Sequence, residues 1–385
     1  MIVPERIAAA FTKEFGTPRD GATVSRAPGR VEVLGNHTDY NGGAVLAAAI
    51  ERYVWSIGIR SGAIRVHSVD YAETVDIEET GMGMEVVHAW HSYVRGVYWA
   101  FRRRGRETVP MLAAVGGDVP IGAGLSSSAA LEVSLVNLIH RLSGGSLEPK
   151  SLAMLAFEAE RIYCNVACGV MDQFASQLCK PDSLLAIDCA KMATKDIPLD
   201  IGARLVVVDS GVSRAAGDAL NTRKEECRQA LQTLNKDGWA LSNLVDIDPR
   251  HLPQAESVLS TTLGMRTKHV VMENARVKQG ILLLQDGRLQ EFGRLMYESH
   301  ESSRDLYEVS HPRLDLLVEL SRNHPAVLGA RMTGAGLGGA ILALVKEKHV
   351  EDYMRSIVRF YEKETGLTPR VIAGRVPGGV VTTTL

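Results

Sequence analysis

A glycine- and serine-rich turn placed directly before a helical pattern constrains this chain more than any other feature. Residues Pro120–Ala130 read Pro-Ile-Gly-Ala-Gly-Leu-Ser-Ser-Ser-Ala-Ala, and Leu131, Leu135 and Leu138 then follow helical spacing. Glycines let a backbone turn tightly and approach a ligand. The first turn of a helix presents unpaired N–H groups and the positive end of its dipole, which suits phosphate. A serine-capped helix after a turn, without any ligand, also explains this local pattern.

The loop differs from nucleotide-binding loops of the Gly-x-x-x-x-Gly-Lys-Ser/Thr type because it contains no lysine. The charge of a bound polyphosphate must therefore be neutralised by Mg²⁺ and by residues elsewhere in the chain. The three serines add hydroxyl groups that can bind phosphate oxygens or Mg²⁺.

A second glycine-rich run spans Gly329–Gly339 and contains the pattern Gly-x-Gly-x-x-Gly. In dinucleotide-binding folds this pattern lies between a strand and a helix. Here the following segment, Ala340–Val345, has the composition of a strand, so the dinucleotide interpretation is rejected. Two separate glycine-rich loops predict that distant parts of the chain converge on one polyphosphate.

A polar cluster spans Ala27–Gly43 and combines arginine, asparagine, histidine and aspartate with several glycines. Such neighbouring donors and acceptors can hold several hydroxyl groups of a sugar. Arg30, on the strand-like start of the segment, can meet a phosphate. A polar surface hairpin without a ligand remains an alternative.

Two acidic residues further along the chain are candidates for chemistry. Asp172 follows an apolar pair at the expected start of a helix, where a carboxylate is favoured in its charged form and can act as a base. The simpler interpretation is a helix cap. Glu160 lies on a helical pattern and, taken alone, reads as a solvated surface residue.

Composition excludes several classes of protein. The 385 residues are 45% hydrophobic and 23% charged, with a formal net charge of −2, so no general basic field attracts nucleic acid. The apolar stretches are far shorter than the roughly 20 residues of a membrane span, and no signal-peptide core is present. The odd cysteine count of five argues against a disulfide framework. We expect a cytoplasmic protein with no membrane or nucleic-acid partner.

Helical and strand-like segments are intermixed along the whole chain, which predicts an α+β class rather than a chain of helices or strands alone. Tyr53–Ile59 and Arg204–Val208 are expected strands, and Tyr353 to Phe360 has helical spacing. The length favours two lobes. Pro198 and Gly202 interrupt the pattern, which predicts an N-terminal lobe of residues 1–195 and a C-terminal lobe of residues 196–385.

Three segments together make the chain recognisable: Gly29–Gly43, Pro120–Ala130 and Gly329–Gly339. In this order they resemble the three motifs of the GHMP kinase superfamily, and the first resembles its galactokinase branch through Gly-Arg-Val and His-Thr-Asp-Tyr-Asn-Gly-Gly. The resemblance covers nearly the whole chain. It implies a two-lobed α+β GHMP kinase fold with the active site in the cleft between the lobes. It also implies an ATP-dependent sugar 1-kinase that phosphorylates the anomeric hydroxyl of galactose or a close galacto-configured sugar.

The resemblance carries roles over to matching positions of this sequence. It implies that Asp172 is the catalytic aspartate and that Arg30 lies near the transferred phosphoryl group. It implies Mg²⁺ as cofactor, with Ser128 and Glu160 as its ligands. Further matching positions are Gly122, Gly124, Ser126 and Ser127 in the phosphate loop, His37, Asp39 and Gly169 at the sugar, and Trp90 on the nucleotide side.

Two positions depart from the family pattern at the sugar. Galactokinases usually have glutamate where this chain has Asn36, and that glutamate holds the C6 hydroxyl; they usually have tyrosine where this chain has Leu220. A neutral asparagine still permits galactose and also permits galacturonate or the pentose arabinose. Galactose is expected first, with a galacturonate or arabinose 1-kinase as the alternative.

A different class of function is a non-catalytic sensor that binds sugar and ATP. The known kind in this family lacks a Ser-Ala pair in the phosphate loop, whereas Ser127-Ser128-Ala129 is intact here. Arg30 and Asp172 are present as well. An active enzyme is therefore the favoured interpretation, with ATP and a monosaccharide as its partners.

Overall fold

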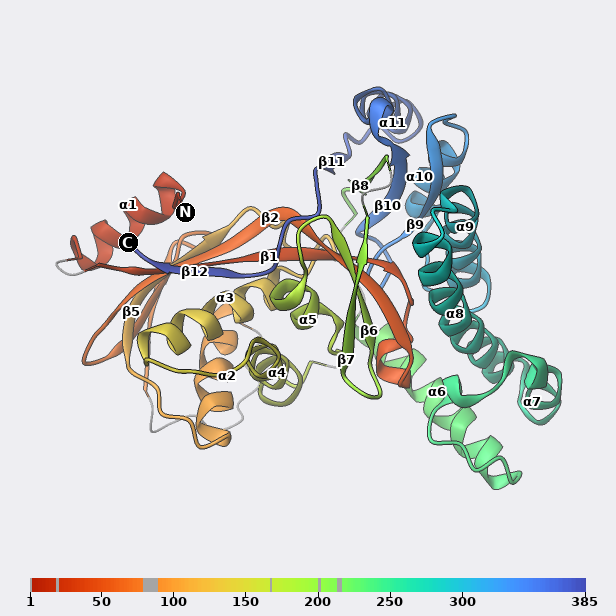
Figure 1. Cartoon of the computed structure of the whole chain (residues 1–385), viewed down its shortest axis with the longest axis horizontal. Coiled ribbons are helices and arrows are strands. Elements are labelled where there is room, and N and C mark those ends of the chain that lie inside the picture. Colours follow the sequence, from red (N-terminus) through yellow and green to blue (C-terminus); the bar gives the residue numbers. More distant parts are fainter. Residues whose placement is uncertain (1, 19–20, 79–88, 167, 200–201, 213–216) are drawn as a thin grey trace.

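The computed structural model describes residues 2–18, 21–78, 89–166, 168–199, 202–212 and 217–385. Within these ranges the chain forms two β-sheets, each covered by helices (Figure 1). This arrangement confirms the predicted α+β class.

The first sheet has the order β12-β1-β2-β5-β3-β4, with β6 pairing with β2 and β7 pairing with β6. Its strands are β1 (Thr23–Leu34), β2 (Ala44–Arg60), β3 (Ile64–Ser68), β4 (Glu73–Ile77), β5 (Met111–Gly117), β6 (Ser183–Asp188), β7 (Ala193–Pro198) and β12 (Val381–Thr384). The pairing of β1 with β2 shifts register between Pro28 and Arg30 and again between Glu32 and Leu34. Such bulges re-aim side chains, and here they enclose the part of β1 that carries Arg30 and Glu32.

The helices of the first lobe lie mainly on one side of this sheet, whereas α1 lies on its other side (Figure 1). They are α1 (Glu5–Phe15), α2 (Trp90–Arg103), α3 (Ser127–Leu142), α4 (Pro149–Glu158) and α5 (Met171–Leu178). A π-helical turn, Ala159–Tyr163, continues α4. Helix α3 packs against β1 and β2, which fixes its N-terminus beside the polar segment that follows β1.

The second sheet is antiparallel and has the order β11-β8-β10-β9. Its strands are β8 (Ala203–Asp209), β9 (Val327–Met332), β10 (Ala340–Lys346) and β11 (Arg370–Ala373). Its helices are α6 (Gly217–Lys236), α7 (Leu252–Val258), α8 (Thr261–Gln285), α9 (Leu289–Asp305), α10 (Pro312–Arg322) and α11 (Val350–Thr365). Short 3₁₀ turns lie at Asp39–Asn41, Leu244–Asp246, Pro249–His251 and Glu347–His349.

The two lobes share a continuous hydrophobic core. One cluster of buried side chains includes Val31 and Leu46 of the first sheet together with Phe292 of α9 and Leu342 of β10. Because this cluster crosses between the sheets, packing holds the lobes in one arrangement around the residues between them.

The chain leaves the first sheet at Pro198 and enters the second at Ala203. The division at residue 195 remains a prediction, and two elements depart from it. Residue 195 lies inside β7, which pairs with β6 over its whole length, from Ala193 to Pro198, in the first sheet. Strand β12 pairs with β1, from Thr23 opposite Thr384 to Arg26 opposite Val381, so the last residues of the chain belong to the first sheet.

In the described ranges, no helix has the length and apolar character needed to cross a membrane.

Candidate active site

Two adjoining cavities contain most of the residues singled out in the sequence. The Asp172 cavity, of about 160 Å³, is lined by residues of both lobes, from Arg30 and Asp172 to Leu220 and Gly334. The Trp90 cavity, of about 330 Å³, is lined largely by the first lobe. Ser127, Ser128 and Val166 line both cavities, so a ligand in one reaches the other at the N-terminus of α3.

The predicted phosphate loop, which leads from Pro120 into the first residue of α3, Ser127, has the turns that its glycines predict. Gly122 and Gly124 have φ of 78° and 79°, and Ser126 has φ of 61°, which is uncommon for a residue with a side chain. Helix α3 then begins at Ser127. Its unpaired N–H groups and positive dipole end therefore lie at the junction of the two cavities.

The third motif packs directly on the phosphate loop. A Cβ at Gly334 would lie 3.0 Å from the carbonyl oxygen of Gly124, and one at Gly339 would lie 2.8 Å from that of Ala123. The two glycine-rich segments therefore meet, and the second segment also contributes Gly334 and Ala335 to the wall of the Asp172 cavity.

Arg30 and Asp172 form a two-pronged ion pair in the Asp172 cavity. Arg30 donates from Nε to Asp172 Oδ1 and from Nη2 to Oδ2, both at 2.7 Å. Arg30 Nη1 donates to the carbonyl oxygen of Gly124 at 2.7 Å, and Ser126 Oγ donates to Asp172 Oδ2 at 2.6 Å. The guanidinium is almost fully buried, while 22% of the Asp172 side chain is exposed. The pair thus ties β1, the phosphate loop and α5 together and leaves the carboxylate facing the cavity.

The two predicted metal ligands are in contact. Ser128 Oγ donates to Glu160 Oε1 at 2.9 Å, and Gln173 Nε2 donates to Glu160 Oε2 at 2.6 Å. Burial, reinforced by the charge of Asp172, raises the pKa of Glu160. Burial and the charge of Glu160 likewise raise the pKa of Glu132 well above its usual range.

This acidic group fits a divalent cation. The described residues contain no cluster of three or more histidine, cysteine, aspartate or glutamate side chains arranged around one point, so a metal here needs phosphate oxygens and water as well. Mg²⁺ prefers such a shell, with one or two carboxylates and the rest from substrate and water. Glu132 Oε1 and Gln173 Oε1 are buried without a partner in the described structure, which is consistent with a further ligand near this group.

Asp39 and Gly169 both line the Asp172 cavity and lie against each other. A Cβ at Gly169 would lie 1.8 Å from Asp39 Oδ2, so only glycine fits there. Burial, and to a smaller extent the charges of Glu32 and Asp172, raises the pKa of Asp39 to about 6. Asp39 is therefore expected to change charge in the weakly acidic range, near pH 6.

His37 lines the same cavity, but both of its ring nitrogens already have partners. Nε2 lies 3.2 Å from the carbonyl oxygen of Ala335, which can only accept, so Nε2 carries the proton. Nδ1 then accepts from the Tyr40 hydroxyl at 2.9 Å. Burial lowers the pKa of His37 well below its usual range, so the ring is neutral. A sugar can gain a hydrogen bond from His37 only if one of these contacts is given up.

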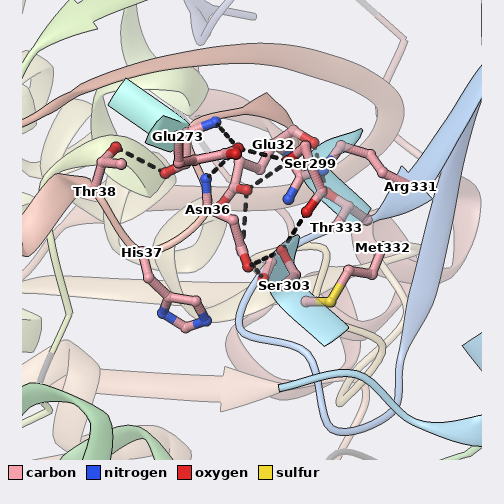
Figure 2. Close-up of polar contacts among 12 residues, drawn as sticks. Glu32, Asn36, His37, Thr38, Glu273, Ser299, Ser303, Arg331, Met332 and Thr333 are labelled. Atoms are coloured by element: carbon pink, nitrogen blue, oxygen red, sulfur yellow. Dashed lines mark hydrogen bonds and ion pairs between the residues drawn. The ribbon is translucent and has the colours of Figure 1, made fainter. Parts of the chain in front are cut away.

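Asn36 lies elsewhere than the sequence led us to expect. It has no exposed surface and is not among the residues that line the Asp172 cavity. Its Nδ2 donates to Glu32 Oε1 at 3.2 Å and to the Gly334 carbonyl oxygen at 2.9 Å, and its Oδ1 accepts from Ser303 at 2.9 Å (Figure 2). These protein contacts occupy the amide behind the wall of the cavity, which departs from the expectation that Asn36 faces a sugar.

The remaining candidates are divided between the cavities. Leu220, on α6, lines the Asp172 cavity. Trp90, at the start of α2, lines the other cavity, stacks on Tyr71 with ring centroids 6.2 Å apart and donates from Nε1 to Glu73 at 2.7 Å. Among the described residues, Trp90 and Asp172 line different cavities.

Sequence reasoning missed Glu32 and Tyr40, which both line the Asp172 cavity. A usable signal existed for Glu32. Alternate residues of a strand point to one face, so Arg30 on the strand-like segment already implied that Glu32 would share its side.

Comparison with known families agrees with this arrangement. Residues 9–58 match the galactokinase galactose-binding signature, residues 92–180 match the N-terminal domain of GHMP kinases, and residues 281–363 match their C-terminal region. The first match covers the segment from α1 to β2, and the second covers the phosphate loop and Asp172.

Individual proteins resemble the chain over nearly its full length. A galactokinase of a Roseiflexus species is 37% identical over 365 residues, which are 93% of this chain and 92% of that protein. The Thermotoga maritima galactokinase is 36% identical over 89% of this chain and 95% of its own. The crystal structure of Lactococcus lactis galactokinase complexed with galactose superposes with a TM-score of 0.93, at 27% identity and with 98% of both chains covered. With these relatives and the two-cavity site in one molecule, the chain belongs to the galactokinase family of the GHMP kinases.

Proposed function

We propose that this protein transfers the γ-phosphate of ATP to the anomeric hydroxyl of galactose. The observation that carries the proposal is the ion pair of Arg30 and Asp172 beside the N-terminus of α3, in a cavity that both lobes line. Galactose is the proposed sugar because the chain matches the galactose-binding signature and because its Lactococcus lactis relative is described as complexed with galactose.

The two cavities suggest how the substrates lie. We place the nucleotide base and ribose in the Trp90 cavity and the sugar in the Asp172 cavity. The phosphates then lie at Ser127 and Ser128, which line both. There the N–H groups of α3 and the backbone of Gly122 and Gly124 face the phosphate oxygens. Mg²⁺, held by Ser128 and Glu160, would neutralise phosphate charge.

The reaction follows from this placement. The anomeric oxygen attacks the γ-phosphorus, the bond from that phosphorus to the β,γ-bridging oxygen breaks, and ADP leaves. Asp172 orients the attacking hydroxyl and accepts its proton. Arg30 stabilises the charge that spreads over the phosphoryl oxygens in the transition state. Phosphoryl transfer depends mainly on positioning and electrostatics, which these rigidly held groups supply.

The test of the proposal is a coupled assay of ADP formation across galactose, galacturonate, arabinose, N-acetylgalactosamine and glucose. Galactose should give the highest kcat/KM. A preference for another sugar would overturn the assignment of galactose, and sugar-independent ATP hydrolysis alone would overturn the kinase.

Removal of either proposed metal ligand should raise the Mg²⁺ concentration needed for half-maximal activity. Ser128→Ala and Glu160→Gln each take an oxygen ligand from a hard cation, and we expect a rise of about tenfold or more. Ser134→Ala is the matched control, because Ser134 lies on the same helix but bonds to Ser56 and to the Ser25 carbonyl. Mg²⁺ titrations of both variants that overlay the wild type would contradict the assignment.

The raised pKa of Asp39 predicts an acidic limit to activity. A carboxyl with a pKa of about 6 is protonated below that pH, and it then loses the charge with which it accepts hydrogen bonds from a sugar. We expect kcat/KM for the sugar to fall about tenfold per pH unit below pH 6. Asp39→Asn should be less active than the wild type at neutral pH, and its kcat/KM should not show this fall below pH 6. A wild-type profile that stays flat through pH 6 would contradict the role of Asp39.

A further inference from the structure

A second carboxylate, Glu32, lies in the wall of the Asp172 cavity. It follows Arg30 by two residues on β1, and the two register shifts enclose both residues. Their partners on β2 are Ala49 and Ala47, so only small side chains lie beside them on that strand. The strand therefore presents a guanidinium and a carboxylate together to the cavity.

The two oxygens of Glu32 have different surroundings. Oε1 accepts from Arg331 Nη1 at 2.8 Å and from Asn36 Nδ2 at 3.2 Å, as Figure 2 shows. In the described structure no hydrogen bond to the side chain involves Oε2. One oxygen is thus fixed by the protein, while the other remains available to a ligand in the cavity.

The buried ion pair of Glu32 and Arg331 is not explained by a gain in folding stability. Arg331 is completely buried, and its Nε and Nη2 atoms have no hydrogen-bond partner among the described residues. A buried ion pair often stabilises a fold no better than apolar residues of the same size. Burial raises the pKa of Glu32, whereas the charge of Arg331 opposes this rise. The arginine therefore helps to keep a carboxylate at the cavity wall.

A neighbouring carboxylate provides the contrast. Glu273, on α8, accepts from the backbone N–H groups of Gly35 and Asn36, from Ser299 and from Arg276. It is completely buried and is not among the residues that line the Asp172 cavity. Glu273 thus fixes the backbone at Gly35 and Asn36. Glu32, in contrast, keeps its Oε2 available to a ligand in the cavity.

We propose that Glu32 is the specificity-determining carboxylate of the sugar site: its Oε2 accepts a hydrogen bond from a hydroxyl of the sugar other than the reacting one. Asn36 and Arg331 are positioning residues that hold Oε1. The inference rests on the proposed function. It replaces the expectation that the side chain of Asn36 contacts the sugar. The group that contacts the sugar is then the charged carboxylate of Glu32 and not a neutral amide.

This assignment changes the expected sugar preference. A carboxylate in the wall repels a carboxylate on the ligand, so galacturonate should be a poor substrate. A sugar that lacks the hydroxyl bound by Glu32 should also be poor, because the buried acceptor is then left without its partner.

The test compares wild type with Glu32→Gln, which keeps the shape and removes the charge. The substrates are galactose, its 2-, 3-, 4- and 6-deoxy analogues and galacturonate. We expect kcat/KM for galactose to fall by about ten- to a hundredfold, the range for a hydrogen bond to a charged group, mostly through KM. For one deoxy analogue the variant and the wild type should be nearly equal, and the relative rate with galacturonate should rise.

Glu273→Gln is the matched control within the same polar cluster. It removes a carboxylate that makes no contact with the cavity, so any loss should be the same factor for every sugar. If Glu32→Gln lowers kcat/KM by one common factor for galactose and for all the deoxy analogues, Glu32 acts only on the structure of the site and the proposal is overturned. ATP affinity, measured separately, reports folding because the nucleotide lies at the other cavity.

Asn36→Glu gives a second, independent test. It places a new carboxylate against Glu32 Oε1 and the Gly334 carbonyl oxygen, which Asn36 Nδ2 now contacts. We expect lower kcat/KM with galactose, and a gain would overturn the proposal. If the wild type phosphorylates no sugar, the proposed function fails. If the wild type phosphorylates galactose and Glu32→Gln has the same kcat/KM as the wild type for every sugar, only this inference fails.

Discussion

Asp172→Asn is expected to lower kcat by roughly 10²-fold or more while leaving sugar and ATP binding nearly intact. The amide keeps the size of the side chain and can still contact Ser126. It cannot accept the proton of the attacking hydroxyl, and it loses the two-pronged charge pair with Arg30. Single-turnover measurements at saturating ATP and galactose separate this loss from any change in binding.

The control for this variant is Asp188→Asn, at the end of β6, where the carboxylate pairs with Lys191 at the surface. It should behave as the wild type. A folded Asp172→Asn protein with near-normal kcat would remove Asp172 from the mechanism.

Arg30 should be equally important, because one side chain performs three tasks. It pairs with Asp172 through Nε and Nη2, and it holds the phosphate loop through Nη1 and the Gly124 carbonyl oxygen. It also supplies the positive charge nearest to the transferred phosphoryl group in our proposal. Arg30→Gln is expected to lower kcat by about 10²- to 10³-fold, the range for loss of a preorganised transition-state donor.

Arg30→Lys separates charge from geometry, because lysine keeps the charge and loses the planar fork. It should remain well below the wild type and above Arg30→Gln. Since Arg30 and Asp172 act as one unit, the double variant should lose much less than the product of the two single losses. Fully multiplicative losses, or equal rates for the lysine variant and the wild type, would contradict the paired role.

Much of the site could be predicted because its signals are local. Glycines followed by serines before a helical repeat indicated the phosphate loop, and the structure starts α3 at Ser127. Asp172 was expected at the start of a helix and lies in the first turn of α5. Such features depend on neighbours in sequence, which backbone conformation and helix capping make readable.

The residues around Asn36 could not be placed in this way, because they depend on long-range contacts. Two register shifts in β1 decide which of Glu32 and Asn36 reaches the cavity. Contacts with Arg331, Ser303 and Gly334, which lie 267 to 299 residues further along the chain, contribute as well. Likewise, no local pattern indicated that β12 returns to pair with β1. Pairing between distant strands follows from the whole fold.

The most direct test of the central claim is the identity of the product. Wild-type protein incubated with Mg²⁺-ATP and galactose should yield one new sugar phosphate, examined by phosphorus and proton nuclear magnetic resonance. We predict a phosphorus signal coupled to the anomeric proton, together with one ADP for each sugar consumed. A phosphate on any other carbon, or ADP formed without a sugar phosphate, would contradict the account.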